Sequence, residues 1–420
     1  MAKKICEDWA DLLFDEKVKI TLANEKDNDI LQDIIQELKL QVLINRGVER
    51  SFALGTGALV LSVQKMKTDG AMYDVSDAEL FAEFVDAKKI YPLSWNNGTI
   101  DECAFVTYKI EKGQRYAYIS MHIKDEKGYY IIRNYKFKCQ NNQLETVEDE
   151  NILEEFSTEN NIPWFVILQP NICNNLDSES PYGISVFANA IHTLMNIDDI
   201  YDSKDLEVML GRRRTFVSED MLTFKNDNGE LTPVFDMQDI SVYTLPKGFN
   251  KEQMIQSDND NLRTDKMIAD LDSELNVLSS KVGFGNERYK FDKGDIQTAT
   301  GVISANSDMF RTIKKHELLL ESALINFIQA IIYANNYFTS NEKIAEEDEI
   351  KIDFDDSIIE DKGAEQVRAQ TEVTQGLRSK VDYLENIRNM SKEQAESELI
   401  RIKNEQQSNI TPFETNLEEM

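Results

Sequence analysis

Residues 180–214 read SPYGISVFANAIHTLMNIDDIYDSKDLEVMLGRRR and carry the clearest architectural signal in the chain. Ser180 is a good helix N-cap, and Pro181 suits the first helical position, where its missing N–H costs nothing. Apolar residues then recur at helical spacing from Ile184 to Met209, until Gly211 ends the pattern. The stretch therefore predicts one long helix that begins at Pro181 and ends near residue 210.

A small β-containing insert follows this helix. It opens with three arginines at 212–214 and contains strand-like pieces at residues 215–217 and 240–245. Its length of about forty residues is too short for a free-standing domain. A second helix, again with apolar residues on one side, is expected over residues 258–281. The sequence therefore predicts two helices that flank the insert.

Downstream of the second helix the pattern changes several times. Residues 283–298 are punctuated by glycine and have no sustained period, so a loop is expected there. A strongly patterned helix is expected over residues 304–337, and alternating residues predict a strand over 350–354. Residues 362–405 are expected to be helical, with breaks near residues 376 and 390.

The first 180 residues mix helical and strand patterns. One helix is expected over residues 27–52, and Gly55 and Gly57 then lead into an apolar strand that reaches Val63. This Gly-x-Gly is too short a signal for a nucleotide-binding loop. Strands rich in Val, Ile, Tyr and Phe predict an antiparallel meander over 104–110, 116–123 and 129–137, and a further hairpin-like strand at 164–168. The expected fold class is α+β.

Composition limits the classes of function. The net charge of −30 disfavours wrapping of nucleic acid, because phosphate binding relies on clustered Lys and Arg. It is compatible with a passage through which DNA slides, since each neutralised phosphate adds affinity and therefore drag. No uninterrupted apolar run approaches the roughly 20 residues of a membrane span. Acidic residues before Trp9 interrupt the apolar region that a signal peptide requires. Neither a membrane helix nor a secretion signal is expected.

Few residue patterns suggest catalysis, and no cofactor is expected. The chain has no GxxxxGKS or GxxxxGKT phosphate loop and no GxSxG nucleophile motif, so neither an ATPase nor a serine hydrolase is expected. The histidines lack zinc-binding spacing, and the cysteines form no CxxC pair and are expected to be small buried residues in a reducing cytoplasm. These residues are His122, His192, His316, Cys6, Cys103, Cys139 and Cys173.

Four short segments stand out in order along the chain: KICEDWADLLF at 4–14, PYGISVFANA at 181–190, TATGVISANS at 298–307 and IDFDDSI at 352–358. Together with the succession of helix, insert, helix, glycine-rich loop, long helix, strand and terminal helices, they resemble the portal proteins of long-tailed phages that infect Gram-positive bacteria. The resemblance covers nearly the whole chain. Gly301 stands where an acidic residue is common in that family, and glycine weakens a helix there by roughly 1 kcal/mol.

The resemblance implies a portal-protein fold with an α/β wing, a helical stem, a small β-containing clip, a long helix close to the tunnel and a helical crown. By that similarity the regions are the wing at 1–180 and 299–360, the two stem helices at 181–210 and 258–282, the clip at 211–257, the tunnel loop at 283–298, and the crown with the C-terminal tail at 361–420.

The resemblance also implies what the protein does. A ring, usually of twelve subunits, would sit at one capsid vertex of the virion after assembly in the host cytoplasm, and would form the channel for DNA packaging and ejection. The expected partners are terminase, head-completion or connector proteins, major capsid protein, scaffold protein and double-stranded DNA that passes without sequence recognition. No enzymatic activity and no membrane partner are implied.

Arg212, Arg213 and Arg214 are candidate contact residues of the clip. They follow the C-terminal end of the predicted helix, where cations are favoured by the helix dipole and can simply cap carbonyl groups. By the resemblance they would instead pair with a neighbouring subunit, terminase or the connector. Both interpretations stay open at this point.

Arg288, Lys290 and Lys293 are candidate contacts to DNA in the predicted loop. They could meet phosphates as the duplex passes, a contact that positions DNA without reading its sequence. A solvated surface loop, in which Glu287 and Asp292 offset these charges, fits the residues equally well. The portal resemblance favours the channel.

Two other functions remain as alternatives. Asp353, Asp355, Asp356, Glu360 and Asp361 invite a divalent metal and hence a carboxylate-dependent nuclease, although their spacing lacks the glycine and bidentate Glu of an EF-hand. A solvated edge that limits strand pairing is the simpler interpretation. The second alternative is another structural subunit of a phage head or tail. Metal-dependent DNA cleavage would favour the first, and a closed ring with a DNA-wide channel would disfavour the second.

Overall fold

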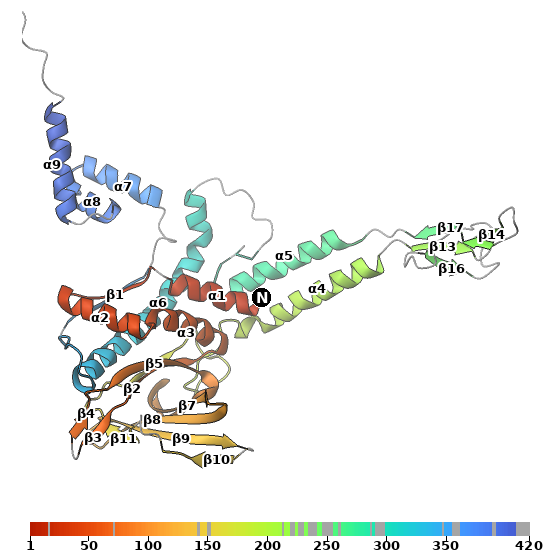
Figure 1. Ribbon diagram of the computed structural model, residues 1–420. Helices are drawn as coiled ribbons and strands as arrows, with labels where there is room; N and C mark the ends of the chain where they lie inside the picture. The colour runs from red at the N-terminus through yellow and green to blue at the C-terminus, as the bar shows by residue number, and fades with distance from the viewer. Residues whose placement is uncertain are drawn as a thin grey trace, which may run out of the picture.

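The computed structural model shows a mixed α+β fold with a long projecting arm (Figure 1). It describes residues 1–15, 17–69, 72–140, 143–148, 153–211, 214–218, 223–225, 231–233, 242–245, 255–258, 262–285, 288–289, 299–346, 348–354, 362–388 and 392–408. A body of helices and antiparallel sheets holds the core. Two helices leave the body together as the arm, and a group of short helices lies apart from both.

The helices of the body are α1 (Ala2–Leu13), α2 (Glu25–Glu37), α3 (Leu40–Leu54) and α6 (Ala299–Phe338). They share one hydrophobic core with the sheets, in which fully buried residues from α1, α3 and α6 come together. Burial of this apolar surface is the main stabilising term of the body. Core residues with no exposed surface include Ile5, Trp9, Ile44, Leu324, Phe327 and Ile331.

The predicted single helix over residues 27–52 is wrong. Asn24 caps α2 with its side chain, which accepts a hydrogen bond from the Lys26 N–H, but α2 ends before Leu38. Lys39 then adopts a left-handed φ of 51° and α3 begins. The apolar spacing continues across this break because both helices bury their apolar residues in the same core. Periodicity alone therefore does not reveal the break.

The helix α6 was predicted to begin at residue 304, but it begins at Ala299 and continues through Gly301. Its segment Ser307–Phe338 is, among the described residues, long and apolar enough to cross a membrane by length and composition alone. Polar residues interrupt the apolar runs of this segment, so the expectation of no membrane-length helix from uninterrupted runs did not include it. Half of the most apolar window is buried inside the protein, as in the central helix of a core.

Two sheets form the β part of the body. A three-stranded sheet places β2 (Gly57–Gln64) between β5 (Glu79–Asp86) and β12 (Phe165–Leu168). The larger antiparallel sheet follows the order β10-β9-β8-β7-β6, with β11 also paired to β9. Its strands are β6 (Ile90–Asn96), β7 (Thr99–Glu111), β8 (Gln114–Lys124), β9 (Tyr130–Gln140), β10 (Gln143–Thr146) and β11 (Glu155–Ser157).

The predicted meander is confirmed, and its turns have the expected chemistry. Asn97 and Gly98 between β6 and β7 have φ of 48° and 79°, and Lys112 and Gly113 between β7 and β8 have φ of 50° and 82°. Two consecutive positive φ angles are the signature of the tight hairpin turn that matches strand twist. The strand expected at residues 164–168 is also present, but it pairs with β2 and not with the meander.

Short strand pairs complete the body. The strand β1 (Lys19–Leu22) pairs antiparallel with β18 (Ile350–Asp353), which confirms the predicted strand at residues 350–354. The pair β3 (Lys67–Asp69) and β4 (Met72–Asp74) forms a separate hairpin, and the 3-10 helix η1 (Ala87–Lys89) connects β5 to β6. Segments more than three hundred residues apart are thus joined in one sheet.

The arm consists of α4 (Ile191–Leu210) and α5 (Thr264–Lys281). It carries short strands at its tip, as Figure 1 shows. A three-stranded sheet there has the order β16-β13-β17, and β14 pairs with β15. These strands are β13 (Arg214–Ser218), β14 (Thr223–Lys225), β15 (Leu231–Pro233), β16 (Val242–Leu245) and β17 (Ile255–Asp258). The predicted order of helix, β insert and helix is confirmed.

The predicted helix start at Pro181 is wrong, because α4 begins ten residues later at Ile191, after the 3-10 turn η2 (Ala188–Ala190). The preceding residues bond to the body instead of to a helix. Gly183 donates its N–H to Thr56 Oγ1 at 2.9 Å, and Val186 donates its N–H to the Phe52 carbonyl at 3.0 Å. Because a Cβ on Gly183 would lie 2.5 Å from the Gly55 carbonyl oxygen, the two backbones approach closely only as glycines.

The second helix of the arm also starts later than predicted, at Thr264, because residues 255–258 belong to a strand. The C-terminal helices are as expected: α7 (Lys362–Thr374), α8 (Lys380–Arg388) and α9 (Lys392–Ser408) are separated near residues 376 and 390. Figure 1 places them together, away from the tip of the arm.

Candidate functional site

Polar contacts tie the two helices of the arm together from base to tip. At the base Lys281 donates to Thr193 Oγ1 at 3.0 Å, and farther out Asn196 donates to Glu274 at 3.5 Å. Near the tip the Arg263 guanidinium holds the Glu207 carboxylate through two hydrogen bonds of 3.1 and 2.8 Å. These hydrogen bonds lower the pKa of Glu207 to about 2, so the pair stays charged across the physiological range.

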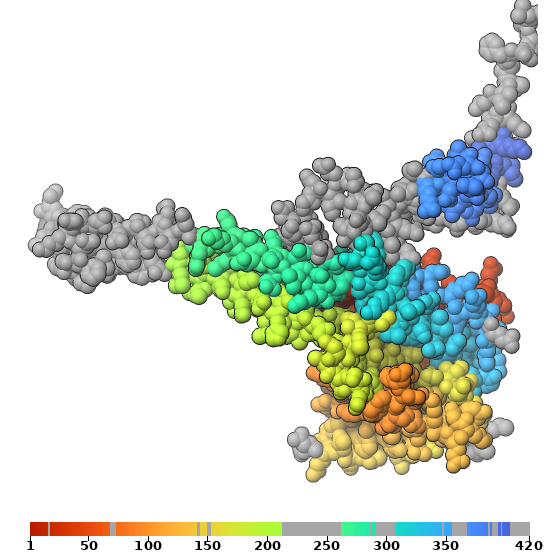
Figure 2. All heavy atoms as spheres, turned by 180° about the vertical axis from the view of Figure 1, so that it is seen from behind, coloured from red at the N-terminus to blue at the C-terminus, as the bar shows by residue number. Residues whose placement is uncertain are grey.

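The outer surface of the arm is unusually apolar. Only Thr193 and Ile197 of α4 are buried, whereas large apolar side chains are exposed on several sides of the helix. Figure 2 shows α4 and α5 as a narrow projection from the body. Exposed apolar surface of this extent marks an interaction site. The exposed apolar residues include Ile191, Met195, Tyr201, Leu206, Val208 and Met209 of α4 and Ile268 and Val277 of α5.

The arm is also acidic. The sequence of α4 contains five Asp or Glu residues and one Lys, and that of α5 contains four Asp or Glu residues and two Lys. A surface with this balance repels phosphate groups more than it binds them. The arm is therefore suited to pack against protein through its apolar residues and to lie near DNA without adhering to it.

Of the three arginines that follow α4 in the sequence, Arg214 is described by the structure. Arg214 is the first residue of β13, where it stands opposite Asp258 of β17 in the antiparallel register. Arg212 and Arg213 lie outside the described residues. Two of the three candidate residues therefore have no described position, and the third belongs to a strand.

The end of α5 is fixed against α1 by Trp9. The Trp9 Nε1–H donates to the Val282 carbonyl at 3.2 Å, and its ring stacks on Phe284 with centroids 4.4 Å apart. The ring of His316 meets Trp9 edge-on at 4.8 Å from the third side. Trp9 has no exposed surface. It joins α1, the end of α5 and α6 at one point.

The left-handed residue Gly283 reverses the chain at this point. Its N–H bonds to the Ser280 carbonyl, and the N–H of Phe284 bonds to the Ser279 carbonyl. With a φ of 90° at Gly283, this is a Schellman motif, which satisfies the last carbonyls of a helix. A Cβ at Gly283 would lie 2.7 Å from Thr312 of α6. Backbone chemistry and packing thus both require glycine here.

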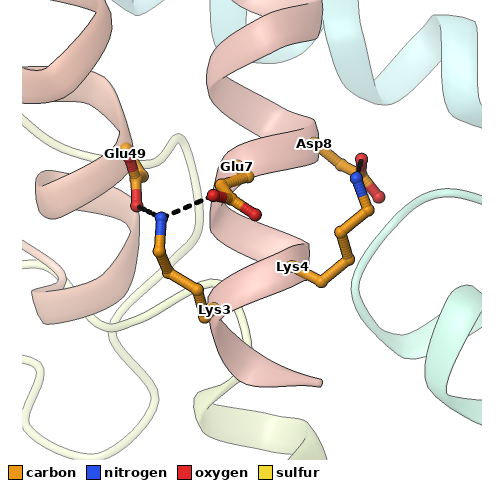
Figure 3. A network of polar contacts seen from close by, with 5 residues as sticks. All are labelled: Lys3, Lys4, Glu7, Asp8 and Glu49. Carbon is orange, nitrogen blue, oxygen red and sulfur yellow. Dashed lines mark hydrogen bonds and ion pairs between the residues drawn. The ribbon is translucent and has the colours of Figure 1, made fainter.

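A second fixed point follows a few residues later, at Asp8. Tyr289 donates its hydroxyl to Asp8 Oδ2 at 2.9 Å, and Arg288 lies 3.7 Å from Asp8 Oδ1. Figure 3 shows that Lys4 approaches the same carboxylate from α1, whereas Lys3 on a different side of the helix pairs with Glu7 and Glu49.

The three predicted loop residues are thus only partly placed. Arg288 lies beside Asp8 and over the Phe284 ring at 5.6 Å, with about a third of its side chain exposed. Lys290 and Lys293 lie outside the described residues. Arg288 is therefore bound to its own chain in this structure, next to the start of the segment that contains the two lysines.

Of the five carboxylates proposed as metal ligands, the structure describes Asp353. Asp353 ends β18, while Asp355, Asp356, Glu360 and Asp361 lie outside the described residues. Within the described part of the chain, no three His, Cys, Asp or Glu side chains form a cluster that could hold a metal ion. His122 and His316 are buried in different regions, and burial lowers the pKa of His122 to about 3 and that of His316 to about 4.

The cysteines are only partly as predicted. Cys6 and Cys103 are buried, and burial raises the pKa of each thiol to about 12, which makes both unreactive. Cys139 is half-buried and Cys173 is exposed. All four are free.

Comparison with known protein families gives a match over residues 1–411, to the family described as phage portal protein, SPP1 Gp6-like. The chain belongs to this portal protein family. Portal proteins are structural and non-enzymatic, so the nuclease alternative is set aside. The family implies a ring of identical subunits at a capsid vertex of the virion, used for DNA packaging and ejection. Among curated proteins, none matches the chain in sequence.

Sequence reasoning missed the contacts that fix this portal protein's loop base. In the sequence, Trp9 and Asp8 belong to the segment at residues 4–14, and Tyr289 belongs to the predicted loop. Asp8 and Tyr289 are separated by 281 positions, so no local pattern connects them. The sequence signal for these contacts is an acidic residue, Asp8, directly before Trp9 on an amphipathic helix.

Proposed function

We propose that α4 and α5 are the stem helices of the portal ring, which line its channel and pack against the stem helices of neighbouring subunits. The observation that carries this proposal is the exposure of apolar residues on several sides of α4. A helix that is apolar on more than one side requires more than one partner. Within the chain α5 supplies one partner, and a neighbouring subunit on each side of the arm would supply the others.

The regions of the chain follow from this assignment. We propose the wing at residues 1–180 and 299–360, the clip at 211–257, the tunnel loop at 283–298 and the crown beyond 361. The non-helical residues 181–190, which bond to the body, would join the wing to the first stem helix. A ring of twelve subunits is the number we propose from the family.

Contacts to other components belong to the two ends of the arm. The clip, with Arg212, Arg213 and Arg214, would dock terminase during packaging and connector proteins afterwards. The wing would meet the major capsid and scaffold proteins. At the base of the arm, the tunnel loop with Lys290 and Lys293 would contact DNA phosphates, because cations in a narrow acidic passage are the groups that a duplex can approach.

The acidic balance of the arm supports a channel that does not retain DNA. A protein that neutralises several phosphates gains affinity with each contact and would have to break them all at every step of translocation. A lining of negative charge avoids this cost. The duplex would then be guided by few contacts, which the proposed loop supplies.

The stem assignment is tested by the substitutions Met195→Glu and Leu206→Glu, with Ser203→Glu as the matched control. All three sites are exposed on α4, so a Glu adds the same charge without disturbing the core of one subunit. We expect the first two variants to lower the fraction of rings at least tenfold, because a charge would be buried between subunits. Native mass spectrometry and negative-stain imaging measure the rings, and thermal unfolding checks each subunit.

The control variant should form rings like the unmodified chain. Rings of unchanged yield in both Met195→Glu and Leu206→Glu would show that α4 does not contact a neighbouring subunit. A closed ring with an axial hole wide enough for B-DNA is the expected product of the unmodified chain.

A further inference from the structure

The Asp8 carboxylate serves partners from two distant parts of the chain. Its Oδ1 lies 2.8 Å from Lys4 Nζ and 3.7 Å from Arg288, and its Oδ2 accepts the Tyr289 hydroxyl at 2.9 Å. Only 5% of Asp8 is exposed. A buried carboxylate is stable only when it is paired and hydrogen-bonded, and loss of one partner is costly. Asp8 therefore holds Arg288 and Tyr289 firmly against α1.

Arg288 and Tyr289, the partners of Asp8, lie in the predicted tunnel loop between α5 and α6. Tyr289 is the last described residue before residues 290–298, and α6 begins at Ala299. Trp9, the neighbour of Asp8 on α1, holds Val282 and Phe284 at the end of α5. Two adjacent residues of α1 thus fix the entry into the loop at two successive points.

Tyr289 is well suited to be held in this way. Its N–H donates to Ser279 Oγ at 3.3 Å, and its ring meets Phe284 edge-on with centroids 5.8 Å apart. Burial and the hydrogen bond to Asp8 raise the pKa of the hydroxyl well above its usual range. The hydroxyl therefore remains a donor at any pH at which the protein functions.

We propose that Asp8 is a positioning residue for DNA passage: it ties the base of the tunnel loop to α1, so that the loop enters the channel from a fixed point. This inference rests on the proposed function of the loop. If Asp8 lost its hold while Trp9 kept its own, the last contact to α1 before the loop would move back from Tyr289 to Phe284. Each residue by which that contact moves back extends the reach of the loop by up to roughly 3.4 Å.

The test uses Asp8→Asn and Tyr289→Phe in the full-length assembled ring, with Glu7→Gln as the matched control. Asn keeps an acceptor but removes the charge, and Phe removes only the hydroxyl. Glu7 lies on the same helix but pairs with Lys3 and not with the partners of Asp8 (Figure 3). Trypsin cleavage after Arg288, followed by mass spectrometry, reports whether the loop base is held. We expect cleavage to be about tenfold faster in both variants than in the control.

A second readout is the amount of nuclease-protected DNA per particle when each variant replaces the natural portal protein during phage assembly. We expect it to fall severalfold for Asp8→Asn and Tyr289→Phe but not for Glu7→Gln, while ring yield and thermal stability stay close to those of the control. Because Tyr289→Phe leaves the charge pairs intact, it keeps the test valid even if Asp8→Asn weakens folding.

Unchanged cleavage in both variants would overturn the inference, because Asp8 would then not hold the loop base. Faster cleavage with normal packaging would show that Asp8 holds the loop base but that this hold is not needed for DNA passage. A deletion within Lys290–Gly294 tests separately whether the loop takes part in DNA passage at all. If the deletion lowers packaging and the Asp8 variant does not, the loop contacts DNA but needs no fixed base. If neither lowers packaging, the loop has no part in DNA passage.

Discussion

His316 shows how a single buried residue sets the response of the protein to acid. It is 3% exposed, packs against Trp9 and Phe52, and accepts a hydrogen bond from the Asn171 N–H on Nδ1 at 3.0 Å. Burial, with a smaller contribution from the nearby charge of Lys315, lowers its pKa to about 4. The imidazole is therefore neutral in the folded protein under conditions where an unfolded chain would be protonated.

This depressed pKa predicts a loss of stability on acidification. Above pH 6.5 neither state binds the proton, so His316 contributes no pH dependence; between pH 6.5 and 4 only the unfolded state binds it, and unfolding is favoured. The substitution His316→Asn keeps an acceptor near the Nδ1 position, and we expect it to lower the free energy of unfolding at pH 7. Between pH 7 and 4.5, however, the free energy of unfolding should fall by roughly 2 to 3 kcal/mol less in this variant than in the unmodified chain.

Guanidinium unfolding at the two pH values measures this difference. His192→Asn is the control, since His192 is exposed on α4 and its replacement leaves the buried His316 in place. The same acid sensitivity in His316→Asn as in the unmodified chain would show that His316 does not control it. His122, which is also buried, should still contribute acid sensitivity in the variant.

At the scale of elements, the end of α5 decides how the arm meets the body. Gly283 supplies both the left-handed conformation of the Schellman motif and the space in which Thr312 lies. Gly98 in the hairpin between β6 and β7 has a similar positive φ of 79°, but a Cβ there would meet no atom within 4 Å. A side chain at Gly98 would therefore have a conformational cost alone, whereas a side chain at Gly283 would have the same conformational cost and a packing cost in addition.

We expect Gly98→Ala to lower the free energy of unfolding by about 1 kcal/mol, which is the conformational cost alone. Gly283→Ala should lose roughly 1 to 3 kcal/mol more, because Thr312 must also move. Chemical denaturation of both variants gives the comparison. Equal losses in the two variants would mean that the contact with Thr312 relaxes without cost.

The elements also show what the sequence could and could not predict. The meander and the strand at residues 350–354 were predictable because alternation and glycine turns are local signals. The start of α4 was not, because the N–H groups of Gly183 and Val186 bond to residues more than a hundred positions away. The break at Lys39 was hidden because two helices that share one core keep one apolar period. The contacts of Asp8 depend on the same kind of distant pairing.

At the scale of the whole molecule, net charge opposes assembly. Copies that each carry a formal charge of −30 repel one another when their arms come together. The exposed apolar residues of α4 and α5 must overcome this repulsion. In the proposed ring, the subunits therefore associate through apolar surface despite their charge.

We accordingly expect ring yield to rise as salt is added, from about 0.02 M to about 0.3 M, because screening weakens repulsion between exposed charges and leaves apolar contacts in place. Analytical ultracentrifugation at fixed protein concentration measures the fraction of rings. A fall in ring yield with salt would instead show that ion pairs between subunits dominate the interface. Sodium and potassium salts should give the same result, since the effect is one of screening.

The pairing of β1 with β18 determines the order in which the protein can be completed during its synthesis. Lys19–Leu22 leaves the ribosome early, but its partner Ile350–Asp353 is made only after the arm, the tip strands and α6. Until then the nascent body has an open strand edge, and until α6 has been made it also lacks the helix that fills its centre. A chain whose translation stops before residue 299 would lack both α6 and the partner of β1, and would become a substrate for chaperones or proteases. The fold thus favours the incorporation of finished chains, which matters for a particle that contains a single ring.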